Sequence, residues 1–431
     1  MDLYDLFLQY PDVITDSRNC RPDSLFFALK GDRFNANEFA ASALEQGCRY
    51  AIIDDATYAM DDRYIVVDDV LESLQQLATT HRKGMPAKII GITGSNGKTT
   101  SKELIASVLK QQFDVLYTQG NYNNHIGVPL TLLQLRPHHQ LAIIEMGANH
   151  PGEIAILSGI AQPDFGIITN VGKAHLEGFG SFEGVKKTKA ELYQQIAKAG
   201  LAVFINRTNP HLMEMAERAE VDEEKRIYYA LEKTEDPACV TGRITGSNPL
   251  LKMECFTGEA FEVQTQLIGD YNAENILAAV TIGQFFGMNN ASIKKGLEEY
   301  VPSNNRSQLT ITASNKLVVD AYNANPTSMQ AAILNFSSLE HPAKALILGD
   351  MLELGDESQD EHQAVADLLS QKGFEKVFLV GSEFTAINTV YPRFGSVEQL
   401  AAVLQEKPLH NHLILIKGSR GIQLEKIIPF V

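Results

Sequence analysis

A glycine-rich segment at residues 91–100, Gly-Ile-Thr-Gly-Ser-Asn-Gly-Lys-Thr-Thr, has the residue types and spacing of a phosphate-binding loop. Backbone N–H groups in such a loop can point at phosphate oxygens, and the helix that follows adds a favourable partial charge. Lys98 can neutralise terminal phosphates, and the Thr99 hydroxyl can ligate Mg²⁺. The strict pattern requires glycine where this chain has Ile92, and a plain glycine-rich turn with a surface lysine is the alternative. The residues expected to contact a nucleotide here are Gly94, Ser95, Asn96, Gly97, Lys98, Thr99 and Thr100.

Further candidate residues follow two other predicted strands. Glu145 ends the apolar run Leu-Ala-Ile-Ile-Glu, and a carboxylate at a strand end beside a phosphate loop can bind Mg²⁺, although alone it can equally be a capping or ion-pair residue. His175 lies in a glycine-flanked loop after another strand, where a single histidine is more often structural than a ligand. Lys186, Lys187 and Lys189 follow on a predicted helix, and a charge run of this kind is usually a solvated face.

The composition excludes several classes of protein. The chain has 37 Lys and Arg against 53 Asp and Glu, a net charge of −16, which disfavours a nucleic-acid partner. No apolar run of ~20 residues is present, so no membrane span is expected. The four cysteines form no C-x-x-C pair, and the N-terminus has no basic region typical of a signal peptide. We therefore expect a cytoplasmic globular protein, acting as a monomer.

The hydrophobic pattern that must position these residues divides the chain into three α/β blocks, at 1–84, 85–303 and 304–431. The first combines short apolar runs with one helix, and residues 81–87 resemble a linker. The second alternates apolar strands with amphipathic helices, which predicts a mostly parallel sheet covered on both faces. Residues 239–268 alternate like antiparallel strands. The third block resumes the strand–helix alternation, which predicts a Rossmann-like domain.

Taken together, the phosphate loop, Glu145, His175 and the segment Lys189-Ala190-Glu191 resemble the Mur ligase family, and the resemblance extends over nearly the whole chain. It implies a small UDP-binding domain, a central ATP-binding domain and a C-terminal ligase domain. It implies that Thr99 and Glu145 bind Mg²⁺ with ATP, that His175 serves a second Mg²⁺, and that Lys189 is carbamylated and faces metal. The catalytic residues implied are Lys98, His175 and Lys189.

The resemblance also implies contacts to the rest of the nucleotide. Asn275 ends a segment similar to the one that hydrogen-bonds adenine, Arg306 resembles an arginine that reaches the nucleotide from a hinge, and Asp320 resembles the ribose-binding aspartate. As isolated residues, Asn275 could be a cap and Arg306 a surface ion-pair partner. The short polar segment 302–306 resembles a hinge, so we expect the second and third blocks to bring these residues together only when they close on each other.

Several segments are similar to the family member that joins D-alanyl-D-alanine to UDP-N-acetylmuramoyl-tripeptide: residues 120–130, 145–154, 320–326 and 348–355. The resemblance leaves open whether the third residue of the tripeptide is lysine or meso-diaminopimelate. His125 stands where an acidic or amide residue is expected. Arg420, after a strand, can bind a peptide carboxylate or belong to a plain turn. The substrate-binding residues implied are Asp16, Ser17, Arg18, Lys30, Asn35, Asn123, Asn124, Asn323, Asn325 and Arg420.

Two other functions remain as alternatives. One is a different ligase of the same superfamily, such as a folylpolyglutamate synthase, but the UDP-type segments of residues 1–84 argue against it because that enzyme lacks such a domain. The other is a nucleotide-driven switch that hydrolyses ATP without transferring phosphate to a carboxylate.

Overall fold

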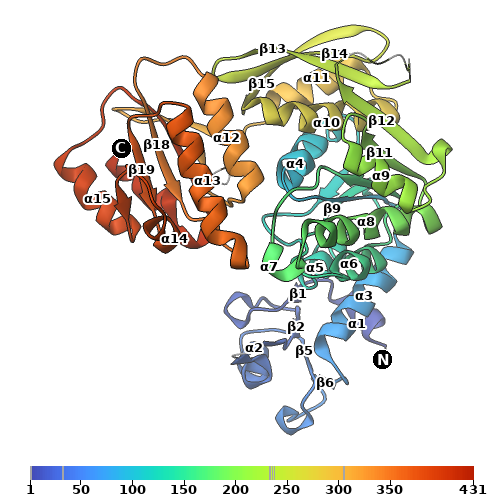
Figure 1. Cartoon of the computed structure of the whole chain (residues 1–431). Helices are drawn as coiled ribbons and strands as arrows, with labels where there is room; N and C mark the ends of the chain where they lie inside the picture. Colours follow the sequence, from blue (N-terminus) through green and yellow to red (C-terminus); the bar gives the residue numbers. More distant parts are fainter. Residues whose placement is uncertain (1, 32–33, 233, 235, 237, 304–305) are drawn as a thin grey trace.

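The computed structural model comprises three α/β units that follow one another along the chain, each built on its own sheet (Figure 1). The sheets have four, nine and six strands, and a two-stranded ribbon accompanies the first. The predicted α/β class and three-part organisation are confirmed. In Figure 1 the N-terminal unit lies at the bottom, the central unit at the right and the C-terminal unit at the left. The residues described are 2–31, 34–232, 234, 236, 238–303 and 306–431.

The N-terminal sheet is parallel throughout, in the order β1-β2-β5-β6. Side chains alternate across it: Phe26 packs with α2, whereas Leu25 and Phe27 belong to the core that extends into the central unit. The strands are β1 (Val13–Ile14), β2 (Leu25–Phe27), β5 (Tyr50–Ile53) and β6 (Tyr64–Val66), with the ribbon β3 (Lys30–Gly31) and β4 (Phe34–Asn35). The helices are α1 (Leu3–Gln9), α2 (Ala40–Glu45) and α3 (Val70–Gly84).

Helix α3 joins the first two units. The prediction of a linker at residues 81–87 is wrong for its first part. Residues 81–84 form the last turn of this helix. His81 is 3% exposed, its Nε2 lies 3.0 Å from the carbonyl oxygen of Leu135, and its ring packs edge-on against Phe7 with centroids 4.8 Å apart. The basic residues that suggested a loop are therefore the end of an amphipathic helix whose apolar face is buried. The N-terminal unit and the central unit share one core through this helix.

The central sheet has the order β15-β14-β13-β12-β11-β10-β7-β9-β8. Its strands from β8 to β13 in this order pair in parallel, and β13, β14 and β15 pair antiparallel, as the alternation at 239–268 predicted. The strands are β7 (Lys88–Thr93), β8 (Val115–Tyr117), β9 (Leu141–Glu145), β10 (Phe165–Ile168), β11 (Ala202–Asn206), β12 (Arg226–Leu231), β13 (Val240–Ser247), β14 (Leu250–Phe256) and β15 (Ala260–Ile268).

Helices cover both faces of this sheet, and the strand residues alternate between the two resulting cores. In β7, Ile89 faces one core, whereas Ile90 and Ile92 face the other. The core of Ile89 includes α5 (Gly127–Leu132), α6 (Glu153–Ala161), α8 (Phe182–Ala199) and α9 (Pro210–Arg218). The core of Ile90 includes α4 (Lys98–Leu109), α10 (Ala273–Phe285) and α11 (Asn290–Glu299).

The strand order places the chemical motifs side by side. Strand β7 lies between β9 and β10. The strands β8 and β9 follow on one side of it and the strands from β10 onward on the other, so the strand order reverses at this point. In open α/β sheets, ligands bind beyond the carboxyl ends of the strands at such a switch. The phosphate loop follows β7, Glu145 ends β9, and the His175 loop follows β10. The three motifs therefore meet at one edge of the sheet.

The C-terminal sheet has the order β16-β17-β21-β18-β19-β20, with only β16 antiparallel to its neighbour. Helices α12 and α13 belong to the core on one face and α15 to the core on the other. The strands are β16 (Gln308–Ile311), β17 (Lys316–Asp320), β18 (Lys344–Gly349), β19 (Val377–Val380), β20 (Arg393–Phe394) and β21 (Leu413–Lys417). The helices are α12 (Pro326–Ser338), α13 (Ser358–Gln371), α14 (Ser382–Ala386) and α15 (Val397–Glu406).

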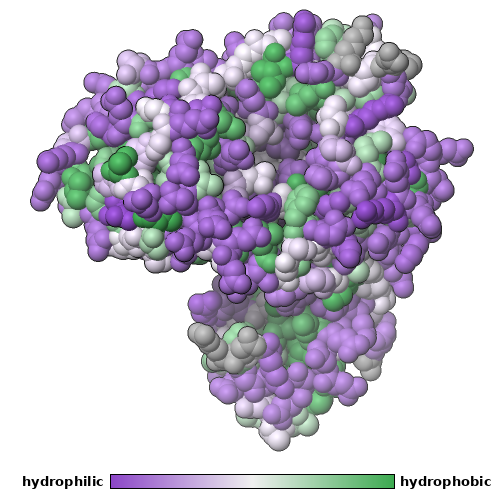
Figure 2. All heavy atoms as spheres, in the orientation of Figure 1, coloured by the Kyte–Doolittle hydropathy of each residue, from purple (hydrophilic) through white to green (hydrophobic). Residues whose placement is uncertain are grey.

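The expected hinge lies between the last two units, and its Asn304 and Asn305 fall outside the described residues. The end of β15 also connects these units, because Ile268 packs in the core of the C-terminal unit. Figure 2 shows a largely hydrophilic surface with a deep notch between the N-terminal and C-terminal units. No helix within the described ranges is long and apolar enough to cross a membrane.

The buried His81 makes a testable contribution to stability. Burial lowers the pKa of His81, so the unfolded chain binds this proton at a higher pH than the folded chain. Folding is then destabilised as the pH falls below about 6.5, by at most about 1.4 kcal/mol per pH unit. In urea denaturation, His81→Phe should lose this part of the pH dependence, whereas substitution of the exposed His410 should retain it. Equal pH slopes for the wild type and His81→Phe would contradict the assignment.

Candidate active site

The phosphate loop between β7 and α4 is held by the residues that follow β10. The N–H of Ser95 donates to the carbonyl of Asn170, and the N–H of Asn96 donates to the side-chain oxygen of Asn170, both at 3.0 Å. The hydroxyl of Thr169 donates to the carbonyl of Asn96 at 2.6 Å. The Thr-Asn-Val-Gly segment after β10 therefore fixes the backbone of the loop.

Two glycines permit these close approaches. Gly94 has φ +148°, and a Cβ at this position would overlap the hydroxyl of Thr169. Gly97 has φ +77°, and a Cβ there would lie 2.7 Å from Oδ1 of Asn275. Only glycine adopts such backbone conformations without strain. Ile92, by contrast, is buried inside β7, so the departure from the strict motif concerns the strand and leaves the loop geometry unaffected.

Glu145 presents a buried carboxylate beside this loop. It is 1% exposed, and its Oε1 accepts hydrogen bonds from the Thr99 hydroxyl (3.1 Å) and the Asn123 amide (2.9 Å). Its Oε2 is buried and accepts no hydrogen bond from any residue that the structure describes. The ammonium of Lys102 lies 3.7 Å from Oε2. One oxygen of a buried carboxylate thus has no hydrogen-bond donor, next to the hydroxyl of the phosphate loop.

These donors fit Mg²⁺. The ion prefers oxygen ligands, keeps several waters and usually takes one or two protein carboxylates together with phosphate oxygens. The Thr99 hydroxyl and the free Glu145 oxygen supply such ligands on the protein side. Among the described residues, no cluster of three or more His, Cys, Asp and Glu side chains forms a metal site. The site therefore suits an ion that obtains most of its ligands from phosphate and water.

Lys98 is half-buried at the start of α4. Its Nζ donates to the carbonyls of Gly94 (2.6 Å) and Ser95 (3.3 Å) within the loop. Burial lowers the pKa of Lys98 to about 8; Glu145 opposes this shift and Arg306 adds to it. The ammonium remains largely charged at neutral pH, as a group that neutralises phosphate must be.

His175 and Lys189 both contact the ring of Phe179. The His175 ring is edge-on to it with centroids 6.3 Å apart, and Nζ of Lys189 lies 5.4 Å from its centroid. Lys189 is 1% exposed and forms no ion pair within the described part of the chain. Burial, followed by repulsion from Lys98, lowers the pKa of Lys189 to about 7. A substantial fraction of this amine is neutral at physiological pH.

The expectation of a solvated lysine face on α8 is wrong for two of the three lysines. Only Lys187 is exposed. Lys186 is buried and forms an ion pair with Glu214 at 2.6 Å, whereas Lys189 is buried without a carboxylate partner among the described residues. Neighbouring lysines on one helix thus have three different environments, because α8 packs on both α6 and α9.

Asn275 is hydrogen-bonded to the helix that follows the phosphate loop. Its Oδ1 accepts a hydrogen bond from the Ser101 hydroxyl (2.9 Å), and its Nδ2 donates to Oδ1 of Asn272 (2.9 Å). Both ends of the amide are therefore engaged, one by Ser101 of α4 and the other by Asn272, which directly precedes α10. One N–H of Nδ2 and one lone pair of Oδ1 remain for a base, so its contact with adenine stays a prediction.

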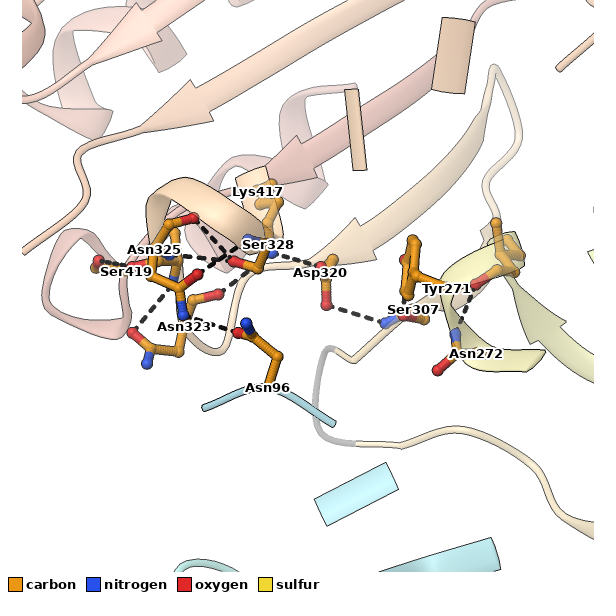
Figure 3. Close-up of polar contacts among 12 residues, drawn as sticks. Asn96, Tyr271, Asn272, Ser307, Asp320, Asn323, Asn325, Ser328, Lys417 and Ser419 are labelled. Carbon is orange, nitrogen blue, oxygen red and sulfur yellow. Dashed lines mark hydrogen bonds and ion pairs between the residues drawn. The ribbon is translucent and has the colours of Figure 1, made fainter. Parts of the chain in front are cut away.

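Asp320 is held at the end of β17 by groups from both sides (Figure 3). Lys417, 2% exposed, forms an ion pair with Oδ2 at 2.6 Å, and the N–H of Ser307 donates to Oδ1 at 3.2 Å. The hydroxyls of Ser307 and Tyr271 lie 3.0 Å apart, which links this aspartate to the central unit. The carboxylate thus lies beside Ser307, directly after the segment 302–306 that the sequence predicts as a hinge.

Contacts cross from the C-terminal unit to the phosphate loop. Nδ2 of Asn325, the residue that caps α12, donates to Oδ1 of Asn96 at 2.7 Å (Figure 3). Two arginine side chains approach the ring of Tyr322, Arg306 at 3.7 Å and Arg420 at 5.4 Å from its centroid. The two units are therefore in contact around the site.

A cleft of about 1050 Å³ between the units collects most of the candidate residues. Gly94 and Lys189 lie outside its lining. Leu71 and Gln75 of α3, which the sequence analysis did not consider, also line the cleft. The predicted residues that line it are Ser95, Asn96, Gly97, Lys98, Thr99, Thr100, Asn123, Asn124, Glu145, His175, Asn275, Arg306, Asp320, Asn323, Asn325 and Arg420.

The candidates in the N-terminal unit do not line this cleft. Arg18 is largely exposed and pairs with Asp16 at 2.6 Å, and the hydrogen bonds from Arg18 lower the pKa of Asp16 to about 2. Lys30 pairs with Asp54 at 2.8 Å. Asn35 accepts a hydrogen bond from the side chain of Asn37 at 2.8 Å, and Ser17 begins the short 3₁₀ turn after Asp16. Their role in substrate binding stays a prediction.

Two buried lysines were missed from the sequence. Lys417 holds Asp320, as described above. Lys102 is fully buried, donates to the Thr118 carbonyl at 2.6 Å and lies 3.0 Å from Glu103 in addition to its approach to Glu145. The only available signal was its position one helical turn after Lys98, because residues four apart lie on the same helix face.

Comparisons with known proteins agree with this architecture. Residues 92–283 match the family model of the Mur ligase middle domain, and residues 305–420 match that of the Mur ligase glutamate ligase domain. The chain is 34% identical to the UDP-N-acetylmuramoyl-tripeptide--D-alanyl-D-alanine ligase of Bacillus subtilis, over 96% of this chain and 92% of the relative.

Solved structures with the same fold cover nearly the whole chain. MurF from Acinetobacter baumannii is 32% identical and has a TM-score of 0.85, over 97% of this chain and 92% of that one. The MurF ligase of Thermotoga maritima, in complex with ADP, is 25% identical and also has a TM-score of 0.85, over 100% and 98%.

The buried Lys102 can be tested by substitution. Lys102→Met retains the length of the side chain but leaves Glu145 without its nearest cation and the Thr118 carbonyl without its donor. Breaking a buried ion pair in this way should reduce the free energy of unfolding by about 3–5 kcal/mol. Lys110→Met, at an exposed position directly after the same helix, is the matched control; it removes only a contact with the Tyr117 ring, 4.1 Å from the ammonium, and should change it by at most about 1 kcal/mol. Equal effects in thermal or urea denaturation would show that Lys102 is not an essential counter-ion.

Proposed function

The chain belongs to the Mur ligase family, and from this premise we propose that it joins D-alanyl-D-alanine to UDP-N-acetylmuramoyl-tripeptide with ATP, in the synthesis of peptidoglycan precursors. The observation that carries the proposal is the shared cleft, in which the phosphate loop and Glu145 of the central unit face Asn323, Asn325 and Arg420 of the C-terminal unit. The similarity to ligases with this substrate pair, over nearly the full length, supports it.

Each of the three units binds a different substrate in this proposal. Residues 1–84 bind the UDP precursor through Asp16, Ser17, Arg18, Lys30 and Asn35. Residues 85–303 bind ATP, and residues 304–431 bind the dipeptide, with Arg420 facing its carboxylate. Asn123 and Asn124 in the cleft contact the peptide of the precursor. The enzyme acts as a cytoplasmic monomer.

The reaction begins when the terminal carboxylate of the tripeptide attacks the γ-phosphorus of ATP, which forms an acyl phosphate and releases ADP. The N–H groups of the loop and Lys98 stabilise the charge on the transferring phosphoryl group, and Asn275, Arg306 and Asp320 hold the nucleotide. The amine of D-alanyl-D-alanine then attacks the acyl carbon, and phosphate leaves with the former carboxylate oxygen. No side-chain nucleophile is required, so the protein contributes positioning and electrostatics.

Thr99 and Glu145 would hold one Mg²⁺ and His175 a second. Bound Mg²⁺ supplies positive charge to the phosphate oxygens. Lys189 is proposed to be carbamylated, because a neutral amine attacks CO₂ and releases a proton to give an anionic carbamate. Burial lowers the pKa of Lys189 to about 7 and so supplies the neutral amine, and no carboxylate among the described residues forms an ion pair with it.

The remaining alternative is a nucleotide switch that hydrolyses ATP without an acceptor carboxylate. ADP release therefore discriminates between the two functions. We expect ADP only when ATP, Mg²⁺ and the UDP-muramoyl tripeptide are all present, and the amide product only when D-alanyl-D-alanine is added. ADP formation at the same rate without the tripeptide would favour the switch. Precursors with lysine or meso-diaminopimelate at the third position, assayed in parallel, would identify the natural substrate.

A second test concerns Lys189. Lys189→Ala should lose nearly all ligase activity, and a small carboxylic acid such as acetate should partly restore it by occupying the place of the carbamate. Lys187→Ala is the matched control, because Lys187 is exposed on the same helix, and it should retain near-normal activity. Full activity of Lys189→Ala would show that this buried lysine has no catalytic part.

A further inference from the structure

The loop that follows β18 in the C-terminal unit, residues 350–355, carries Glu353, and the carboxylate of this residue points toward the central unit. The loop leads into η6 (Gly355–Glu357). Oε2 of Glu353 accepts a hydrogen bond from Nδ1 of His175. The backbone N–H of Glu177 approaches the carbonyl of Glu353 at 3.4 Å, so the main chains of the two loops also meet. Both Glu353 and His175 line the cleft.

The backbone that carries Glu353 is anchored on both sides. Asp350, 1% exposed, accepts two backbone N–H groups at the start of α14, both at 3.0 Å. The N–H of Leu352 donates to the hydroxyl of Ser419 at 3.0 Å, and Leu354 is buried. Glu353 itself has φ +63°, a left-handed conformation that is uncommon for residues other than glycine. The fold therefore fixes this glutamate, although its side chain is half-exposed.

His175 is constrained in the same manner. It has φ +52° and precedes α7 (Leu176–Phe179) as its N-cap. Its ring packs edge-on against Phe179, the ring that also contacts the ammonium of Lys189. Nε2 of His175 makes no hydrogen bond with any residue in the described ranges. Glu353 and His175, which lie on different units and both have left-handed backbone conformations, thus meet through the hydrogen bond between their side chains.

A second ion pair lies beside this contact and holds the same loops together. Lys173 pairs with Glu361 at 2.6 Å and with Glu357 at 3.2 Å, and both glutamates belong to the C-terminal unit. Gly172 approaches Thr327 so closely that a Cβ would lie 2.8 Å from the threonine hydroxyl. These neighbours dock the units without touching His175. The hydrogen bond between Glu353 and His175 can therefore be removed while these other contacts between the units remain.

We propose that Glu353 is a positioning residue for His175. A carboxylate on Nδ1 keeps the proton on that nitrogen and leaves Nε2 with its lone pair, as in the carboxylate–histidine pairs that orient metal ligands. His175 is then ready to bind a cation only when the C-terminal unit is docked. Phosphoryl transfer in the central unit is thereby tied to the presence of the unit proposed to bind the amine acceptor. This inference rests on the proposed function of His175 as a ligand of the second cation.

The test compares Glu353→Ala and Glu353→Gln with Glu361→Gln, which removes a carboxylate from the same interface without touching His175. The first measurement is NMR of ¹⁵N-histidine-labelled protein without metal, which reports which ring nitrogen carries the proton. His175 should be protonated at Nδ1 in the wild type and in Glu361→Gln, and should become a mixture in Glu353→Ala. Glu353→Gln should retain the wild-type form, because its amide oxygen can still accept the hydrogen bond.

The second measurement is titration with Mn²⁺, followed by electron paramagnetic resonance, in the presence of the β,γ-imido analogue of ATP. The weaker of two Mn²⁺ sites should lose about 10–100-fold in affinity in Glu353→Ala and much less in Glu353→Gln. Glu361→Gln should bind Mn²⁺ as the wild type does. In the ligase assay, Glu353→Ala should lower kcat with little change in KM for the UDP precursor.

The outcomes separate this inference from the proposed function. If His175 in the wild type carries its proton on Nε2, or if Glu353→Ala leaves the ring nitrogens unchanged, Glu353 does not position His175. If the nitrogens respond but the wild type binds a single Mn²⁺, the positioning role holds and the assignment of His175 to a second cation fails. Equal effects of Glu353→Ala and Glu361→Gln on both measurements would reduce Glu353 to a docking contact and overturn the proposal.

Discussion

The hydrogen bonds between the phosphate loop and the end of β10 are the constraint around which the site is arranged. Ser95 and Asn96 are hydrogen-bonded to Thr169 and Asn170 at distances of 2.6–3.0 Å, so the loop is tied to the end of the neighbouring strand. The same strand leads directly into the loop that carries His175. Because β9 lies on the other side of β7, Glu145 is fixed relative to both. Parallel strands whose carboxyl ends coincide thus determine the distances among all the proposed phosphate-site groups.

Burial of charge is the second feature that organises the site. Lys102 and Glu145 are almost inaccessible to solvent, and Lys189 is buried beside the Phe179 ring with no ion pair to any residue that the structure describes. Such groups are costly to bury unless they are paired, and the free oxygen of Glu145 and the unpaired Lys189 are therefore the places where a charge partner is missing. In a low-dielectric site, a cation bound at the free Glu145 oxygen would interact strongly with that carboxylate. The buried Glu145 carboxylate and Lys189 amine are thus held in place by the protein in the absence of a ligand.

The third feature is that no single unit contains the whole site. Helix α3 of the N-terminal unit reaches the cleft with Leu71 and Gln75, and it shares its core with the central unit. Asp320, Asn325 and Glu353 reach the same cleft from the C-terminal unit. The hydrogen bond from Asn325 to Asn96 and the contact between Glu353 and His175 cross that interface. Movement of the C-terminal unit would therefore change the environment of the phosphate loop and of His175 together.

The sequence by itself determined the α/β class, the three sheets, the antiparallel segment at 239–268 and the phosphate loop, because each depends on local periodicity or on glycines required within a short turn. Most of the candidate residues that it indicated line the cleft, whereas more than half of the lining was not indicated. Only the tertiary structure decided that residues 81–84 finish a helix, that Lys186 is paired whereas Lys189 is not, and that both ends of the Asn275 amide are engaged. Only the tertiary structure revealed the contacts of Lys102, Lys417 and Glu353. Their partners Glu145, Asp320 and His175 lie 43, 97 and 178 positions away in the chain. Burial and ion pairing between such distant residues are set by how the units pack, and no local pattern records them.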